Sequence, residues 1–215
     1  MPDEALKPGI RIALRLHEIG DASPYQLSFA GKGKSGASFG FMQGDLAAGQ
    51  PEVVRTFRQA LADAGLPAPD IADLVRRLSV HLIANPLTAA ETRRVNDALL
   101  GARAQVDAMD ETILGVVYGG VDRCIQHAGR AGRAIAPKAV IYMALWINMT
   151  GAPSKLLTWL DGGDPGLRTP VPELGATVEG PAMEAYLRAT DYFTENPGNL
   201  PHMMQSAAAG VAALS

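Results

Sequence analysis

Residues 17–43 have the sequence HEIGDASPYQLSFAGKGKSGASFGFMQ, and this is the most informative stretch of the chain. Upstream of it, apolar residues recur at helical spacing over Lys7–Ile19, and Gly20 is a natural stop for that helix. The segment from about 24 to 41 has no helical period and is rich in Gly and Ser, which predicts a β-hairpin or paired loops. The front of the chain therefore places a short β-element directly after an apolar helix.

Helical patterns dominate the rest of the sequence. The clearest helix start is Thr88, with Glu91 three residues later as the second half of a capping box. In the longest pattern, Gly115, Gly119 and Gly120 lower helix propensity, so we expect them to let another helix approach closely. We predict a mainly α fold with a small β-hairpin in the N-terminal third. The predicted helices cover about 51–64, 70–83, 88–100, 102–128, 137–148, 180–195 and 200–214.

Composition describes an ordinary globular protein. The chain has 215 residues, 47% hydrophobic and 19% charged, and a net charge of −3, which carries no signature of nucleic-acid binding. No apolar run has the length of a membrane span, and the early acids and basic residues near the N-terminus argue against a signal peptide. Cys124 is the only cysteine, which excludes an internal disulfide, and we expect it in the core. Composition does not indicate an oligomeric state.

A nucleotide site is the first alternative for the glycine-rich segment. Gly31, Gly33 and Gly36 satisfy the G-x-G-x-x-G pattern, which requires a buried strand before the glycines and a helix after them. The strand expected before the glycines is short and half polar. The residues after the glycines include another glycine and two aromatic residues, which is a poor start for a helix. We therefore interpret this segment as a hairpin tip with solvated lysines, which could contact an acidic substrate, and we predict no cofactor.

Glu18 is the residue with the clearest chemical potential. It lies in the last turn of an apolar helix, where the negative end of the helix dipole and partial burial both disfavour the ionised carboxylate. A carboxyl group that stays protonated near neutral pH is what a general acid for glycoside cleavage needs. The alternative, on position alone, is an exposed glutamate on the helix surface.

Two segments are similar to the lysozyme superfamily. Residues 35–43, SGASFGFMQ, resemble the small-residue turn that follows the helix-ending catalytic Glu of goose-type lysozymes and bacterial lytic transglycosylases. Residues 146–159, WINMTGAPSKLLTW, resemble the Tyr-Asn-x-Gly-x-x-x-Val-x-x-Trp stretch of the transglycosylases, with Asn, Gly and Trp in matching order. The chain departs from the family at Ile147, where the family has Tyr, and at Ile19, where many members have Ser. A looser resemblance links the middle of the chain to chitosanases.

The resemblance implies an α+β lysozyme-like fold, in which one domain over residues 1–215 has two lobes and carries the hairpin at about 24–41. It implies that Glu18 is the proton donor and that Asn148 orients the substrate. Its further implication is that the cleft is lined by Ser35, Ser38 and Gln43. Two alternatives stay open from the residues themselves: Gln43 as an amide that satisfies its own turn, and Asn148 as a helix C-cap.

A second carboxylate would be needed by an inverting or a retaining hydrolase. Asp45, just past the turn, is the best candidate, although it could instead cap the helix that begins near Pro51. Asp21 is next, but it is so close to Glu18 that it more simply caps a turn. Without a second carboxylate, one Glu would act as acid and then as base, with help from the acetamido group of the substrate. A metal is not expected, because no pair among His17, His81, His127 and His202 has ligand spacing.

These observations give the hypothesis of an enzyme that cleaves a β-linked amino-sugar polymer, most simply peptidoglycan, which lies outside the cytoplasm. The expected partner is thus a polysaccharide, with no nucleic acid and no membrane span. A chitosanase or other polysaccharide hydrolase of the same superfamily is the first alternative. The second is a non-catalytic binding or structural module that keeps the lysozyme-like shape, which the departures at Ile19 and Ile147 motivate.

Overall fold

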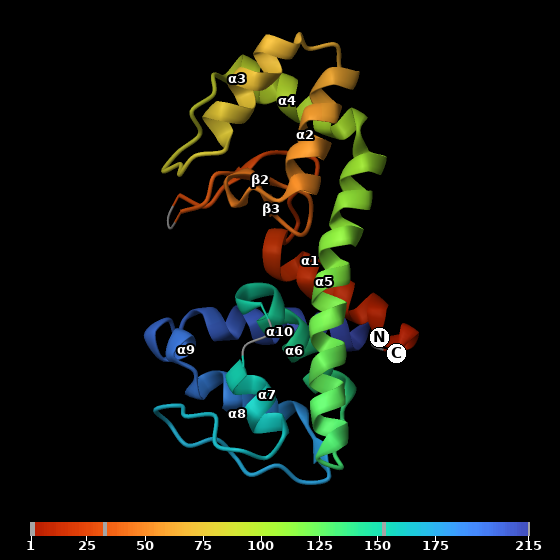
Figure 1. Ribbon diagram of the computed structural model, residues 1–215, viewed down its shortest axis with the longest axis vertical. Helices are drawn as coiled ribbons and strands as arrows, with labels where there is room; N and C mark the ends of the chain where they lie inside the picture. The colour runs from red at the N-terminus through yellow and green to blue at the C-terminus, as the bar shows by residue number, and fades with distance from the viewer. Residues whose placement is uncertain (1–2, 32–33, 152–153, 215) are drawn as a thin grey trace. The chain divides into compact units, whose positions relative to one another are not determined.

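The computed structural model describes residues 3–31, 34–151 and 154–214 and is mainly α-helical (Figure 1). The described residues form ten α-helices, a small three-stranded antiparallel sheet and a two-stranded parallel pair, which confirms the predicted fold class. The chain divides into two compact units. Unit 1 consists of Met1–His17 and Gly115–Ser215, and unit 2 is the intervening segment Glu18–Leu114. That the two form a single domain with two lobes stays a prediction.

Unit 2 begins with the predicted hairpin. Strands β1 (Ser28–Phe29) and β2 (Ala37–Phe39) pair antiparallel, and β3 (Gly44–Asp45) adds to the other edge of β2 beyond the expected end of the hairpin. Ala37 and Phe39 are fully buried, whereas Ser38 between them is only half-buried. This alternation gives the sheet one apolar face, which packs on the core of the unit, and one polar face.

Three helices contribute to the core of unit 2: α2 (Pro51–Asp63), α3 (Ala68–Leu78) and α4 (Ala89–Gly101). Both halves of the Thr88–Glu91 capping box are present at the start of α4, as predicted. The predicted helix over 70–83 is wrong at both ends. Helix α3 begins at Ala68, after Pro67 as N-cap, and it ends at Leu78. The largest fully buried side chains of this core belong to Phe39, Phe57, Leu46, Leu61, Leu78 and Leu99.

Unit 1 is built around α6 (Pro137–Thr150), which lies against α8 (Gly180–Ala189) and α10 (Asn199–Ala212) (Figure 1). The residues of α6 from Ala139 to Ile147 are all buried, which explains why this segment is apolar on every side. The shorter elements of unit 1 are α7 (Ser154–Leu160), α9 (Asp191–Glu195), β4 (Ala134–Ile135), β5 (Thr177–Val178) and the 3-10 turn η1 (Glu4–Leu6). Unit 2 also contains a 3-10 turn, η2 (Leu46–Ala48).

Two helices, α1 (Lys7–Ile19) and α5 (Arg103–Arg130), contain the boundaries between the two units. Helix α1 has the predicted bounds, and α5 is within two residues of its prediction. The predicted continuous helix over 180–195 is wrong, because Thr190 adopts an extended conformation and its hydroxyl accepts the N–H of Phe193. Thr190 therefore ends α8 and caps α9.

Helices α1 and α10 approach each other closely in unit 1. Gly9 and Gly210 face one another, and a Cβ built on Gly9 would lie 2.6 Å from the carbonyl oxygen of Gly210. Both positions therefore require glycine.

Cys124 is fully buried in the same unit, as predicted, and burial raises the pKa of its thiol to about 12. Within the described residues, no helix combines the length and the apolar character that crossing a bilayer demands.

The three glycines of α5 differ in what surrounds them. A Cβ on Gly120 would lie 2.7 Å from Cγ2 of Ile147 in α6, which confirms the predicted close approach, whereas Gly115 and Gly119 have open space and the prediction is wrong there. We expect Gly120→Ala to lower the free energy of unfolding by about 1–3 kcal/mol through overpacking. The adjacent Gly119→Ala, a matched control, should raise it by about 0.5–1 kcal/mol through helix propensity. Urea unfolding of the two variants measures both; equal effects would contradict the packing argument.

Candidate active site

Glu18 is the penultimate residue of α1, and its side chain is half-buried. The chain then turns back at once, since the N–H of Ala22 donates to the carbonyl of Ile19 at 2.9 Å. Two residues later, the carbonyl of Pro24 accepts the N–H of Gly40 at 2.8 Å. The segment that leaves Glu18 is therefore bonded directly to the turn that follows β2.

The turn over residues 40–43 has an unusual backbone. Gly40 has a φ of 79°, and Gln43, with a φ of 52°, is the only residue other than glycine with a positive φ in the described part of the chain. Its side-chain Nε2 donates to the carbonyl of Gly40 at 3.0 Å, and its own N–H donates to the same oxygen at 3.2 Å. These bonds offset the roughly 1–2 kcal/mol that a left-handed conformation costs a residue with a Cβ.

Asp110 of α5 holds this turn from the core side. Its carboxylate is fully buried, and its two oxygens accept the N–H groups of Phe41 at 2.9 Å and Met42 at 3.0 Å. A Cβ on Gly40 would clash with Oδ1 of Asp110, so this glycine is required by space as well as by its φ. Sequence reasoning missed Asp110. The sequence did contain a signal for it, namely a carboxylate on an otherwise apolar helix face. Asp110 shares that face with Val106 and Leu114, which are also fully buried.

A row of polar residues crosses the sheet beside the turn. Ser28, Ser38 and Asp45 are direct cross-strand partners, so their side chains share one face, and all three are half-buried. The hydroxyl of Ser28 donates to Oε1 of Gln43. The structure therefore brings together three of the predicted site residues, Ser38, Gln43 and Asp45. It adds Ser28, which the sequence could not indicate without the strand register.

Asp45 already has two structural bonds. Its Oδ1 accepts the N–H of Gly36 at 2.9 Å and that of Ala47 at 2.8 Å, so the carboxylate joins β3 to the start of β2 and caps η2. The alternative of a cap for the helix at Pro51 is wrong, since the N-cap of α2 is Gln50. A base at position 45 would have to use the other carboxylate oxygen, Oδ2.

The two remaining predicted residues lie in different parts of the fold. Ser35 is half-buried just before β2, and its carbonyl accepts the N–H of Leu82 at 3.0 Å. Asn148 is half-buried near the end of α6 in unit 1. The helix C-cap is Gly151, with a φ of 72°, so the alternative of Asn148 as the C-cap is wrong.

Two contacts from the helices fix the segment between α1 and β1. The Tyr25 hydroxyl donates to Oδ1 of Asp107 at 3.0 Å, and the N–H of Leu27 donates to Oδ1 of Asn96 at 2.9 Å.

At the hairpin tip, Lys34 is exposed, while Lys32 and Gly33 of the glycine pattern lie outside the described residues. The pattern is followed by strand β2 and not by a helix, which is inconsistent with a phosphate-binding loop.

His17 in unit 1 precedes Glu18 and stacks on His202, with ring centroids 4.9 Å apart. Its Nδ1 is buried without a hydrogen-bond partner in the described structure, while Nε2 of His202 contacts the carbonyl oxygen of His17 at 3.0 Å. Burial of the ring, and secondarily its electrostatic interaction with His202, lowers the pKa of His17 from 6.5 to about 4. No group of three potential metal ligands is present among the residues described.

The shifted pKa of His17 predicts a loss of stability in mild acid. The folded state disfavours the imidazolium, so stability present above pH 6.5 should fall as the pH drops to about 4, by about 2 kcal/mol once partial exposure is allowed for. Urea unfolding at pH 7, 5.5 and 4 measures this loss. His17→Phe, which keeps a ring but cannot be protonated, should flatten the profile, whereas His81→Gln, at an exposed position, should not. An unchanged slope in His17→Phe would assign the acid sensitivity to other groups.

Comparison of the chain with family models, with curated proteins and with solved structures found no match.

Proposed function

We propose that this protein cleaves a β-linked amino-sugar polymer, with peptidoglycan as the leading candidate and Glu18 as the general acid. The observation that carries the proposal is the connection between Glu18 and the turn. A half-buried glutamate lies in the last turn of α1, and the segment after it is bonded through Pro24 to Gly40 in a turn fixed by Asp110. The same order of helix, hairpin and Met-Gln turn is the basis of the resemblance to lysozyme-like enzymes.

The polar side chains on the sheet and in the adjoining turn suit the recognition of a sugar. Ser28, Ser38 and Gln43 offer hydroxyl and amide groups that can exchange hydrogen bonds with the hydroxyl and acetamido groups of an amino sugar. Because Gln43 is bonded to both Gly40 and Ser28, its amide is held in one orientation before a ligand arrives. Preorganised polar groups of this kind reduce the entropy lost on binding.

In the proposed reaction, the carboxyl group of Glu18 donates its proton to the glycosidic oxygen as the bond from that oxygen to the anomeric carbon breaks. The anomeric carbon passes through an oxocarbenium-like state. The resulting Glu18 carboxylate then removes a proton from the incoming hydroxyl group. That hydroxyl is either water, which gives hydrolysis, or a hydroxyl of the same sugar, which gives an anhydro product.

Asp45 bears on the choice between these two outcomes. Its Oδ1 accepts two backbone N–H groups, which gives this carboxylate a structural task in the sheet. This engagement favours a mechanism with Glu18 as the one catalytic carboxylate, and among such mechanisms the resemblance to lytic transglycosylases favours the one that gives the anhydro product. Hydrolysis with Asp45 as base, as in a chitosanase-like enzyme, is the second candidate.

The experiment is mass spectrometry of the soluble products after incubation with purified peptidoglycan and, separately, with chitosan. Anhydro-sugar products from the wild-type protein, absent with Glu18→Gln, would support the transglycosylase mechanism. Products with a free reducing end would support hydrolysis and direct attention to Asp45. If neither polymer yields products, the proposal of an enzyme acting on these glycans is wrong. Glycan binding that survives Glu18→Gln would then favour a non-catalytic lysozyme-like module.

A further inference from the structure

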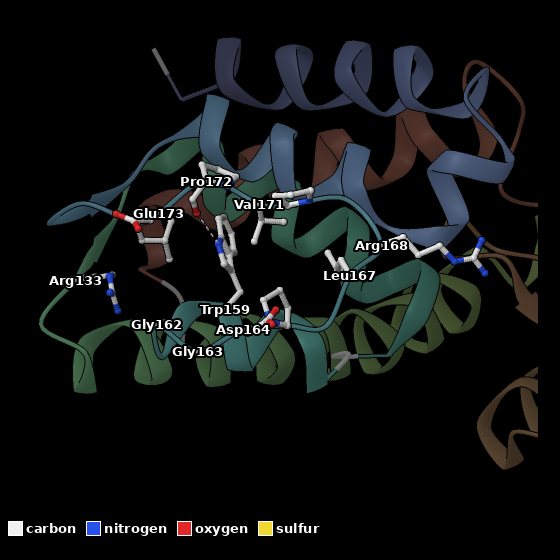
Figure 2. A pocket seen from close by; sticks show the side chains of 13 residues that line it. Arg133, Trp159, Gly162, Gly163, Asp164, Leu167, Arg168, Val171, Pro172 and Glu173 are labelled. Carbon is white, nitrogen blue, oxygen red and sulfur yellow. Dashed lines mark hydrogen bonds between the residues drawn. The ribbon is translucent and has the colours of Figure 1, made fainter.

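Unit 1 contains a pocket that the proposed reaction does not use. The loop over residues 162–174 folds back across Trp159 of α7 and leaves a pocket of ≈ 610 Å³ beneath it, with Arg133 and Glu173 toward one end and Arg168 toward the other (Figure 2). A volume of this size is typical of sites for small molecules or short peptides.

Hydrogen bonds and a ring contact hold the walls of the pocket. Nε1 of Trp159 donates to the carbonyl of Pro172 at 3.0 Å, and the indole stacks on Tyr186 with ring centroids 4.8 Å apart. On the other side of the loop, Nζ of Lys155 donates to the carbonyl of Gly166 at 3.2 Å. The walls are therefore held in place by bonds at both ends of the loop, which lowers the ordering cost of binding.

Arg133 supplies a cation that lacks a counterion in the described structure. Its Nη1 donates to the carbonyl of Leu160 at 3.0 Å, and no described carboxylate lies within ion-pair distance of its half-buried guanidinium. Arg168, by contrast, forms an ion pair with Asp191 at 3.2 Å. A guanidinium has five N–H donors in a fork that fits a carboxylate, so Arg133 retains donors for an anionic group.

The other charges limit the kind of anion. Asp164 and Glu173 also line the pocket, and with the two arginines they balance its formal charge. Asp164 accepts the N–H of Gly166, and no described cation is paired with either carboxylate. A polyanion would be repelled by these two groups. A ligand that carries both a carboxylate and an amine matches the lining, because each of its charges finds an opposite one.

We propose that this pocket binds a short peptide, with a carboxylate on Arg133 and an amine near Asp164 or Glu173. Val171 and Pro172 supply apolar wall for the body of the peptide. The choice of peptide rests on the proposed function. Peptidoglycan carries short stem peptides with carboxylate and amine groups, so the pocket would recognise the peptide part of the polymer whose glycan strand is cleaved.

The test is a titration of the full chain with the tripeptide L-Ala–γ-D-Glu–meso-diaminopimelate, followed by calorimetry and by amide chemical shifts. We expect saturable binding with shifts in residues 162–174. Arg133→Gln should weaken binding by about tenfold or more, as expected for loss of a charged hydrogen-bonded pair. Arg130→Gln, with the same charge change on an exposed arginine outside the pocket, should alter it less than about twofold.

Arg133→Lys keeps the charge and can still donate to Leu160, so it separates the loss of ligand contacts from a collapse of the loop. It should bind more weakly than wild type and more tightly than Arg133→Gln. No saturable binding to wild type, or equal affinity in Arg133→Gln, would overturn the proposal. The titration requires no cleavage. Glycan cleavage without peptide binding removes only this inference, and peptide binding without cleavage removes only the enzymatic function.

Discussion

Asp110→Ala is expected to lower the free energy of unfolding by about 2–5 kcal/mol, because it leaves the buried N–H groups of Phe41 and Met42 without their acceptors. Each orphaned donor keeps its full desolvation cost, and the cavity left by the side chain adds to the loss. Urea unfolding at pH 7 measures the effect. The turn that carries Gln43 should also become mobile, which increased hydrogen exchange at residues 40–43 would report.

Asp107→Ala is the matched control for this prediction. Asp107 lies on the same helix, is only half-buried, and accepts one bond from the Tyr25 hydroxyl, so its removal should cost about 0.5–1.5 kcal/mol. Asp110→Asn should fall between the two, since its amide retains one acceptor oxygen. If Asp110→Ala proved no more destabilising than Asp107→Ala, Asp110 would not be what holds the turn.

Glu18→Gln should reduce kcat on the susceptible glycan by about 10²–10⁴-fold, because the amide fills the same space but is far too weak an acid to transfer a proton to the leaving oxygen. The expected signature is a loss in kcat with little change in KM, since the sugar contacts proposed for Ser28, Ser38 and Gln43 do not depend on Glu18. Initial rates of soluble product release at saturating and at low substrate concentrations separate the two parameters.

Glu195→Gln serves as the control for the loss of a carboxylate at a helix end. Glu195 is the last residue of α9 and is exposed, so its replacement should leave the rate unchanged. The unfolding midpoint of Glu18→Gln must also match wild type for the loss to be catalytic. Residual activity within about threefold of wild type would exclude Glu18 as the general acid.

The parts of the fold that could be predicted from the sequence depend on neighbouring residues. Helix α1 and its end at Gly20, the Thr88–Glu91 capping box and the hairpin all follow from local periodicity, caps and turn residues. The parts that could not be predicted depend on distant partners. The parallel pair β4–β5 consists of two-residue strands more than forty residues apart, and so short a strand has no period of its own.

The candidate site divides in the same way. Ser38, Gln43 and Asp45 could be chosen from one short segment, and the structure places them together. Ser28 joins them only through the strand register, and Asp110 only through the packing of a helix almost seventy residues away in sequence. A carboxylate on an otherwise apolar helix face was the available signal for Asp110.

The contact of Gly9 with Gly210 has a consequence for the order in which the chain folds during synthesis. Unit 2 is complete at Leu114, whereas α10 begins only at Asn199. At about 5–20 residues per second, several seconds separate the emergence of the two from the ribosome. During that interval unit 2 can fold, while the face of α1 that carries Gly9 and Ala13 lacks its partner α10. That face of α1 is thus open to chaperones until α10 has been synthesised.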